Sequence, residues 1–180
     1  MRKGHNMHER KAEISDLVGI MEVIEDARQY LKEQGIDQWQ DGFPTEEVIV
    51  EDIIMRESYV FVEEEEVIGY MSLNLDREPS YDAIYDGAWK LEGSDFGTIH
   101  RNAVKSTHRG QGISLRMFFL AEQVCRKNNK QSIRLDTHRD NQLMQHLATK
   151  YGYEYCGVIK LARNAGDRIA YEKLLYHKAF

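Results

Sequence analysis

The segment Thr98–Ser114 constrains this chain most, because it turns from a strand into a helix across two glycines. Residues 99–104 are rich in β-forming side chains and are followed by turn formers. From Ile113 onward, apolar residues recur with the 3.6-residue period of a helix. The turn Arg109-Gly110-Gln111-Gly112 can bring its backbone close to a ligand. Because the first amides of a helix lack internal partners and attract anions, the segment predicts a phosphate-binding turn.

Two familiar nucleotide-binding motifs are incomplete at this turn. A dinucleotide fingerprint needs a third glycine, and Leu115 occupies that position. A P-loop needs Gly-Lys-Ser/Thr after the glycines, and that sequence is absent. A nucleotide-dependent oxidoreductase that uses Gly110 and Gly112 stays open as a rival, and saturable binding of NAD without binding of coenzyme A would favour it.

The turn and its flanks resemble the acetyl-coenzyme A signature of the GNAT-type N-acetyltransferase superfamily, Gln/Arg-x-x-Gly-x-Gly/Ala. The signature falls on Arg109, Gly112 and Ser114, and its wider form is also matched at Val104, Gly110 and Ile113. Ser106 stands where the family usually has Pro, and Ser114 where it usually has Gly or Ala.

A second stretch, Asn141–Tyr153, resembles the family motif Asn-x-x-Ala-x-x-Leu-Tyr-x-Lys-x-Gly-Phe. The family's usual acid is the Tyr of this motif, and Ala148 occupies its position here. This departure makes a non-catalytic GNAT-fold module, which binds acyl-coenzyme A or regulates, a credible alternative.

The periodicities along the chain predict the element order β-α-α-β-β-β-α-β-α-β-β, which is also that of the GNAT fold. We therefore expect an α/β (α+β) fold with a mixed, mostly antiparallel central sheet and helices on both faces. The predicted elements outside Thr98–Ser114 are a strand Lys11–Ser15, a helix capped by Ser15 or Asp16 and ended by Gly35, a helix after Thr45, a hairpin of Ser58–Glu63 and Val67–Leu75, an aperiodic stretch 76–97, a strand Ser132–Thr137, a helix capped by Asp140 or Asn141, and strands Tyr153–Leu161 and Arg168–Leu175 around a turn at Asn164–Gly166.

The length of 180 residues predicts one domain over residues 10–180, after a leader at 1–9 that is disordered, an expression remnant or upstream of a start at Met7. Neither a secretory signal nor a membrane span is visible, so we expect a cytoplasmic protein with Cys125 and Cys156 reduced. The sequence shows no metal-ligand spacing. A net charge of −6 argues against nucleic-acid binding and is compatible with a cationic acceptor.

The resemblance implies acetyl-coenzyme A as cosubstrate and assigns most of its contacts to backbone groups. The amides of Gly110, Gln111 and Gly112 would hold the pyrophosphate, with Arg109, Ile113 and Ser114 completing the turn. Ala103 and Val104 would pair with the pantetheine arm like an added strand, and Asn141 would contact that arm. Asn141 has an equally good alternative role as a helix cap.

For the chemistry, an acceptor amine would attack the thioester directly, so the protein needs a base and a proton donor. We name His100 as base, because an unperturbed histidine titrates near pH ~6.5 and strand parity places it on one face with Asn102 and Val104. Asp136 and His138 are alternatives, and a core role for His100 is nearly as well supported. Tyr151, three residues after Ala148, is the candidate acid.

Aromatic side chains before the central strand suit a cationic ligand through their ring quadrupoles. Trp39 and Tyr85 are the candidates that would line the acceptor site, although loop aromatics often bury themselves instead. The acceptor would be a primary amine on a small molecule, a peptide N-terminus or a lysine. The sequence does not determine the oligomeric state, and a homodimer stays open.

Overall fold

The computed structural model describes residues 7–76, 78–93, 95–161 and 166–175. Most of the expected leader, and Asn164 and Ala165 of the predicted turn, lie outside these residues. The elements are β1 (His8–Lys11), η1 (Ile14–Asp16), α1 (Leu17–Glu33), α2 (Glu46–Ile54), β2 (Ser58–Glu63), β3 (Glu66–Asn74), η2 (Pro79–Tyr81), β4 (Phe96–Val104), η3 (Ser106–His108), α3 (Ile113–Lys127), β5 (Ser132–Thr137), α4 (Gln142–Lys150), β6 (Glu154–Lys160) and β7 (Asp167–Leu174).

The strands form a seven-stranded sheet in the order β1-β2-β3-β4-β5-β7-β6, so β4 is an interior strand. β4 and β5 run parallel, whereas β1 with β2, β2 with β3, β5 with β7 and β6 with β7 run antiparallel. The mixed, mostly antiparallel sheet of an α/β protein is confirmed. The chain divides into two compact units, and β4 contributes Phe96–His100 to one and Arg101–Val104 to the other.

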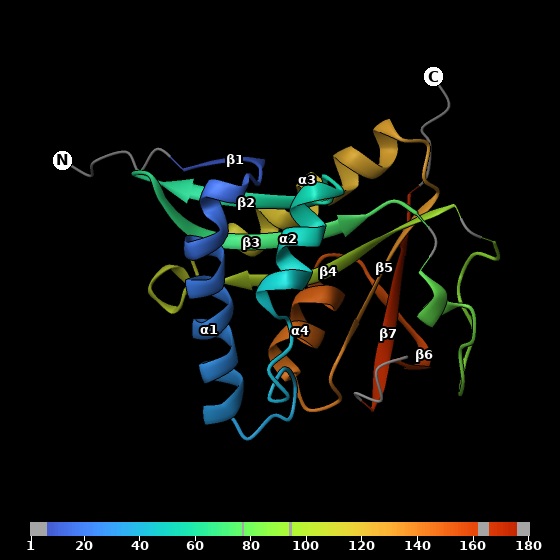
Figure 1. Cartoon of the computed structure of the whole chain (residues 1–180). Helices are drawn as coiled ribbons and strands as arrows, with labels where there is room; N and C mark the ends of the chain where they lie inside the picture. The colour runs from blue at the N-terminus through green and yellow to red at the C-terminus, as the bar shows by residue number, and fades with distance from the viewer. Residues whose placement is uncertain (1–6, 77, 94, 162–165, 176–180) are drawn as a thin grey trace. The chain divides into compact units, whose positions relative to one another are not determined.

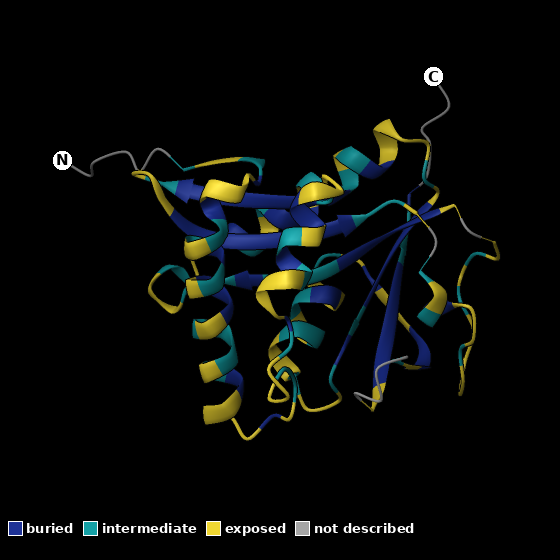
Figure 2. Ribbon diagram, viewed as in Figure 1, coloured by how far each residue is buried: buried dark blue, intermediate teal, exposed yellow. Residues whose placement is uncertain are grey.

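The first unit comprises residues up to Leu73 together with Arg101–Ser114. Its helices α1 and α2 pack against β2 and β3 (Figure 1), because both helices carry an apolar stripe at helical spacing. The opposite face of α1 is exposed (Figure 2). The buried core of this unit comprises Ile20, Val23, Ile24, Ile49, Ile53, Val60, Val62, Val67 and Tyr70, with Ala12 and Ala103 at its margin.

The second unit comprises Asn74–His100 and the residues from Leu115 onward. One of its clusters joins Tyr81 and Phe96 to Ile159 of β6 and Ala170 of β7. The aperiodic stretch 76–97 belongs to this unit and is anchored to it. Tyr85 forms an isolated antiparallel bridge with Val158, in which each amide donates to the other carbonyl at 2.8 Å.

The first strand differs from the prediction. It spans His8–Lys11, which includes His8 and Glu9 of the expected leader, and residues 14–16 form a 3₁₀ turn. The register of β1 is set by its antiparallel pairing with β2, where His8 lies opposite Val62, and this long-range partner leaves no local signal. The other predicted helices and strands are confirmed, with ends shifted by a few residues.

Cys125 and Cys156 are buried and free, and burial raises the pKa of the Cys125 thiol to about 12. Over the described ranges, no helix has both the length and the apolar character needed to cross a bilayer. No group of three or more metal-ligating side chains is found there either.

Candidate functional site

The turn between β4 and α3 has open backbone positions. Gly110 and Gly112 adopt φ values of 76° and 84°, a left-handed conformation that side chains disfavour. A Cβ atom built on either glycine would meet nothing within 4 Å. The amides of Gly110, Gln111 and Gly112 find no backbone acceptor among the described residues. These unpaired backbone donors and the open space at the two glycines come directly before a helix of 15 residues.

This arrangement fits a diphosphate group. Amides at the start of a helix carry a partial positive charge, and the absence of Cβ atoms lets phosphate oxygens come within hydrogen-bonding distance. Ile113, only 2% exposed, anchors the first turn of α3, and the small Ser114 follows it. The side chain of Gln111 donates to the carbonyl of Thr107 at 3.3 Å. The predicted phosphate-binding turn is thus neither plugged nor at a sheet edge.

The side chain of Arg109 is engaged by α1. Its guanidinium carbon lies 4.0 Å from the ring centroid of Tyr30, and Nη2 lies 3.5 Å from Oδ2 of Asp26. Arg109 is thus held beside the turn by a ring and a carboxylate. The same loop carries Lys105, whose Nζ lies 3.1 Å from Oε2 of Glu22.

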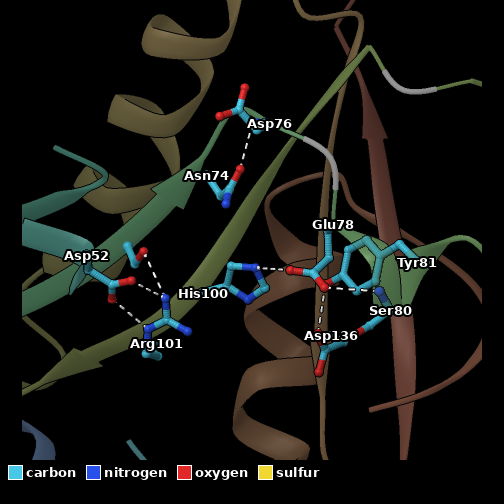
Figure 3. Close-up of polar contacts among 10 residues, drawn as sticks. Asp52, Asn74, Asp76, Glu78, Ser80, Tyr81, His100, Arg101 and Asp136 are labelled. Atoms are coloured by element: carbon cyan, nitrogen blue, oxygen red, sulfur yellow. Dashed lines mark hydrogen bonds and ion pairs between the residues drawn. The ribbon is translucent and has the colours of Figure 1, made fainter. Parts of the chain in front are cut away.

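β4 changes conformation in its middle. Arg101 has φ 49°, a left-handed value that costs a non-glycine residue about 1–2 kcal/mol. Its guanidinium binds Asp52 of α2 through Nε at 2.8 Å and Nη2 at 2.5 Å (Figure 3). Tyr70 donates its hydroxyl to the same carboxylate at 2.8 Å. Asp52 is buried at 5% exposure, so the charged pair is a strong anchor for the distorted residue.

Because of this distortion, alternation along the strand no longer predicts which side chains share a face with His100. Side chains alternate between faces only while the backbone stays extended, and Arg101 interrupts the extension between His100 and Asn102. The prediction that His100, Asn102 and Val104 share one face therefore does not carry across Arg101. β4 pairs with β5 over Phe96–Thr98, ahead of Ala103 and Val104. Ala103 is buried and Val104 is half-buried.

His100 has a carboxylate partner that the sequence did not reveal. Its Nε2 lies 3.1 Å from Oε2 of Glu78, and both side chains are less than one-fifth exposed (Figure 3). Burial raises the pKa of Glu78, but the hydrogen bond and charge of His100 and the bonds from Ser80 outweigh it and lower the pKa to about 2. A carboxylate ionised at neutral pH can only accept, so Nε2 of His100 is a donor to Glu78 whether the ring is charged or neutral. In the neutral ring, Nδ1 then holds the free lone pair.

Tyr81 and Asp136 complete the polar cluster around His100. The Tyr81 hydroxyl donates to Oδ2 of Asp136 at 2.7 Å, and its ring centroid lies 6.5 Å from that of His100. Burial raises the pKa of Asp136, and burial together with the Asp136 charge raises that of Tyr81 well above its usual value. Tyr81 therefore stays a neutral hydrogen-bond donor.

A buried ion pair fixes the stretch that carries Glu78 and Tyr81. Arg134 of β5 and Glu172 of β7 lie opposite each other, and Nε donates to Oε1 at 2.9 Å. The other carboxylate oxygen accepts the amide of Lys90 at 2.6 Å, and the Trp89 ring lies 4.1 Å from the Arg134 guanidinium. Trp89 in turn donates Nε1–H to the carbonyl of Tyr81 at 3.0 Å. This chain of contacts orders the stretch before β4.

The candidates of the second motif lie at the two ends of α4. Asn141 is the N-cap, and its Oδ1 accepts the amide of Met144 at 3.1 Å. Tyr151 is the C-cap, half-buried, with its ring centroid 5.0 Å from that of Phe118. Ala148 is fully buried. Asn141 thus has its capping role, and Tyr151 has an aromatic neighbour.

The candidates for the acceptor site and the remaining base have contacts of their own. Trp39 is partly buried and packs against the core of the first unit. Tyr85 is 46% exposed, with Nζ of Lys160 4.8 Å from its ring centroid. Nδ1 of His138 accepts the amide of Asp140 at 3.1 Å. None of these contacts indicates that Trp39, Tyr85 or His138 binds a substrate.

Sequence reasoning missed Glu78 and Asp52. Glu78 comes before Pro79, a sequence typical of the start of a helical turn, and its Oε1 accepts the amide of Ser80 at 3.1 Å. That signal indicates a cap and carries no information about His100. Asp52 lies in the apolar sequence of α2, where a charged residue at a buried helical position is the one available hint.

Three comparisons place the chain among known proteins. The sequence matches the acetyltransferase (GNAT) family over residues 24–153. A GNAT-family acetyltransferase from Streptococcus agalactiae has 34% identity and a TM-score of 0.83, with coverage of 95% of this chain and 96% of that one. A comparison with curated protein sequences gives no match.

More distant solved structures share the fold. The PaiA N-acetyltransferase from Thermoplasma acidophilum, solved in complex with coenzyme A, has 18% identity and a TM-score of 0.69 over 94% of this chain and 99% of that one. A putative acetyltransferase from Staphylococcus aureus has 24% identity and a TM-score of 0.71 over 93% and 99%. The family match supports an acyltransferase, and the GNAT family uses acetyl-coenzyme A. The chain belongs to the GNAT acetyltransferase family.

Proposed function

We propose that this protein transfers the acetyl group of acetyl-coenzyme A to a primary amine in the cytoplasm. The open turn at Gly110–Gly112 carries the proposal, because its free amides suit the diphosphate of the cosubstrate. Ala103 and Val104 would bind the pantetheine arm as an added strand, with one amide donating to the thioester oxygen. Asn141 would contact the same arm in addition to capping α4.

His100 is the proposed base. The acceptor enters as an ammonium ion, and Nδ1 of His100 takes its proton while Glu78 holds Nε2–H. The free amine attacks the thioester carbonyl, so a carbon–nitrogen bond forms, the carbon–sulfur bond breaks, and the nitrogen gives up its second proton to water as the amide forms. The departing thiolate takes a proton, for which Tyr151 is the candidate donor. Holding the amine and the thioester side by side supplies much of the rate.

The acceptor is a primary amine on a small molecule, a peptide N-terminus or a lysine. Trp39 and Tyr85 are its proposed aromatic contacts, since ring faces attract ammonium groups. The charged carboxylate of Glu78 adds a negative potential near the base, which favours a cationic acceptor.

One observation favours a second candidate function, a GNAT-fold module that binds acyl-coenzyme A without turnover. Ala148 is fully buried and has no hydroxyl, at the motif position where the family usually has a Tyr. Such a protein would retain the phosphate-binding turn and lack a proton donor for the thiolate.

Release of free thiol from acetyl-coenzyme A, measured with a panel of small amines, N-terminal peptides and lysine peptides, tests the proposal. We expect saturable release with at least one amine, and loss of most of it in H100Q. Binding of coenzyme A without release across the panel would support the non-catalytic module. Absence of coenzyme A binding would reject both candidates.

A further inference from the structure

One carboxylate of α1 holds the backbone of the loop that leads into the phosphate-binding turn. Oδ2 of Asp26 accepts the amide of Ser106 at 2.7 Å, and Oδ1 accepts the Ser106 hydroxyl at 2.8 Å. Ser106 is the first residue of η3, and this 3₁₀ turn ends two residues before Gly110. Asp26 thus binds both donors of one residue in a two-point contact.

Asp26 lies on a stripe of α1 that contacts the same loop in three successive turns. Glu22, Asp26 and Tyr30 recur every four residues and so share one face of the helix. Glu22 binds the Lys105 ammonium, and the Tyr30 ring lies under the Arg109 guanidinium. Of these three side chains, Asp26 alone binds a backbone group of the loop, and it does so at Ser106, one residue after the Lys105 amide that donates to the Ile68 carbonyl at 2.9 Å. Asp26 is therefore the contact of α1 that can fix the backbone at the start of η3.

We propose that Asp26 is a positioning residue for coenzyme A, which holds the loop so that the amides of Gly110–Gly112 are aligned before the ligand binds. This rests on the proposed function of the turn. A ligand that binds one conformation loses apparent affinity in proportion to the fraction of protein outside it. Anchoring η3 on α1 raises the binding-competent fraction without contact between Asp26 and the ligand.

Simple electrostatics predicts the opposite sign for Asp26. A carboxylate close to a site for phosphates repels them and pairs with Arg109, which would otherwise be available to the anion. Removal of Asp26 would then tighten binding. The positioning role predicts weaker binding, so the direction of the change separates the two accounts.

The geometry of Ser106 offers a substitution that replaces the contact. Lys105 has φ −51° and ψ 139°, an extended conformation that suits a residue before proline. Ser106 stands at the first helical position, where proline is favoured because its ring fixes φ and no amide needs an acceptor. S106P should therefore hold the start of η3 without any help from Asp26.

Calorimetric titration of coenzyme A into five proteins tests this role: wild type, D26A, S106P, the double variant D26A/S106P and E22A. E22A is the matched control, because it removes a carboxylate one turn earlier on the same face, which binds a side chain of the same loop. We expect D26A to bind coenzyme A about tenfold more weakly, because it loses the hydrogen bonds from Ser106 to the charged carboxylate. We expect the affinity of E22A to change by less than twofold.

The rescue decides between positioning and a general structural role. We expect D26A/S106P to bind within about twofold of wild type, with melting temperatures of all five proteins within a few degrees. Equal or tighter binding in D26A would overturn the proposal, as would weak binding that S106P fails to restore. Wild-type protein that does not bind coenzyme A would reject the proposed function, and the positioning role with it.

Discussion

The segments before and after β4 are held by different kinds of contact. The stretch 78–93 is fixed by the pair of Arg134 and Glu172, with side chains only 3% and 0% exposed. The loop 105–112 is held mainly by exposed carboxylates, with Asp26, Glu22 and Glu66 at 31%, 60% and 56% exposure. His108 of this loop also lies 3.2 Å from Glu63, which is 14% exposed. Buried charges are costly to leave unpaired, whereas exposed ones contribute little to folding. We therefore expect changes before β4 to alter stability, and changes after it to alter ligand binding.

The largest effect should come from E172Q. It leaves the Arg134 guanidinium without its buried counter-charge and places an amide among the donors of Ser132, Lys90 and Leu91. We expect the free energy of unfolding to fall by about 3–5 kcal/mol in chemical denaturation. E154Q is the control, because Glu154 makes an exposed pair with Lys90, and its loss should cost less than about 1 kcal/mol. Equal losses in both variants would contradict the contrast between buried and exposed contacts.

The second effect concerns catalysis by His100 of β4, which pairs with Glu78 of the stretch before that strand. H100Q should lower kcat about a hundredfold at saturating acetyl-coenzyme A, because removal of a general base typically costs that factor or more. The dissociation constant of coenzyme A should stay within about twofold, since His100 is not part of the turn. Unchanged kcat would transfer the base role to Asp136 or His138.

The third effect is a pH dependence of stability carried by Glu78. Its folded pKa of about 2 lies below the usual 4.5, so the stabilisation is complete above pH 4.5 and is lost as the pH falls through 2. E78Q should be less stable than wild type by on the order of 1–2 kcal/mol near pH 7. The difference should shrink as the pH falls through that window. Denaturation curves between pH 2 and 7 measure it, and a constant difference would contradict the assigned pairing with His100.

The last effect is a modest loss of stability in G112A that accompanies a larger loss of binding. The left-handed φ of 84° costs an alanine about 1–2 kcal/mol, although its Cβ meets no protein atom. Coenzyme A affinity should fall by a larger factor, because the methyl group would enter the space assigned to the diphosphate. G35A is a suitable control, since Gly35 also has a positive φ and open space and lies at the end of α1. Equal coenzyme A affinity in G112A and G35A would remove the turn from the binding site.

The turn after β4 and the side-chain clusters also differ in how far the sequence could predict them. Every part of the turn between β4 and α3 is local: a strand, two glycines and a helical period follow one another within Thr98–Ser114. Such features are carried by backbone propensity, so a single sequence indicates them. The order of helices and strands along the chain followed from similar local patterns.

The side-chain clusters were not predictable in this way. Glu78 lies 22 residues from His100 in a stretch without periodicity, and Asp26 lies 80 residues before Ser106. Neither pair leaves a pattern in one sequence, because tertiary packing alone brings its members together. The left-handed Arg101 shows a further limit. Alternation along a strand predicts a shared face only where no residue leaves the extended conformation.

The backbone amides of Gly110, Gln111 and Gly112 provide the most direct measurement of the central claim. Amide chemical shifts of isotope-labelled protein, followed during titration with coenzyme A, report which of them receives the diphosphate. We expect these three amides to show the largest downfield shifts, saturating with one dissociation constant. Saturable binding of coenzyme A that leaves the three amide signals unmoved would contradict the account.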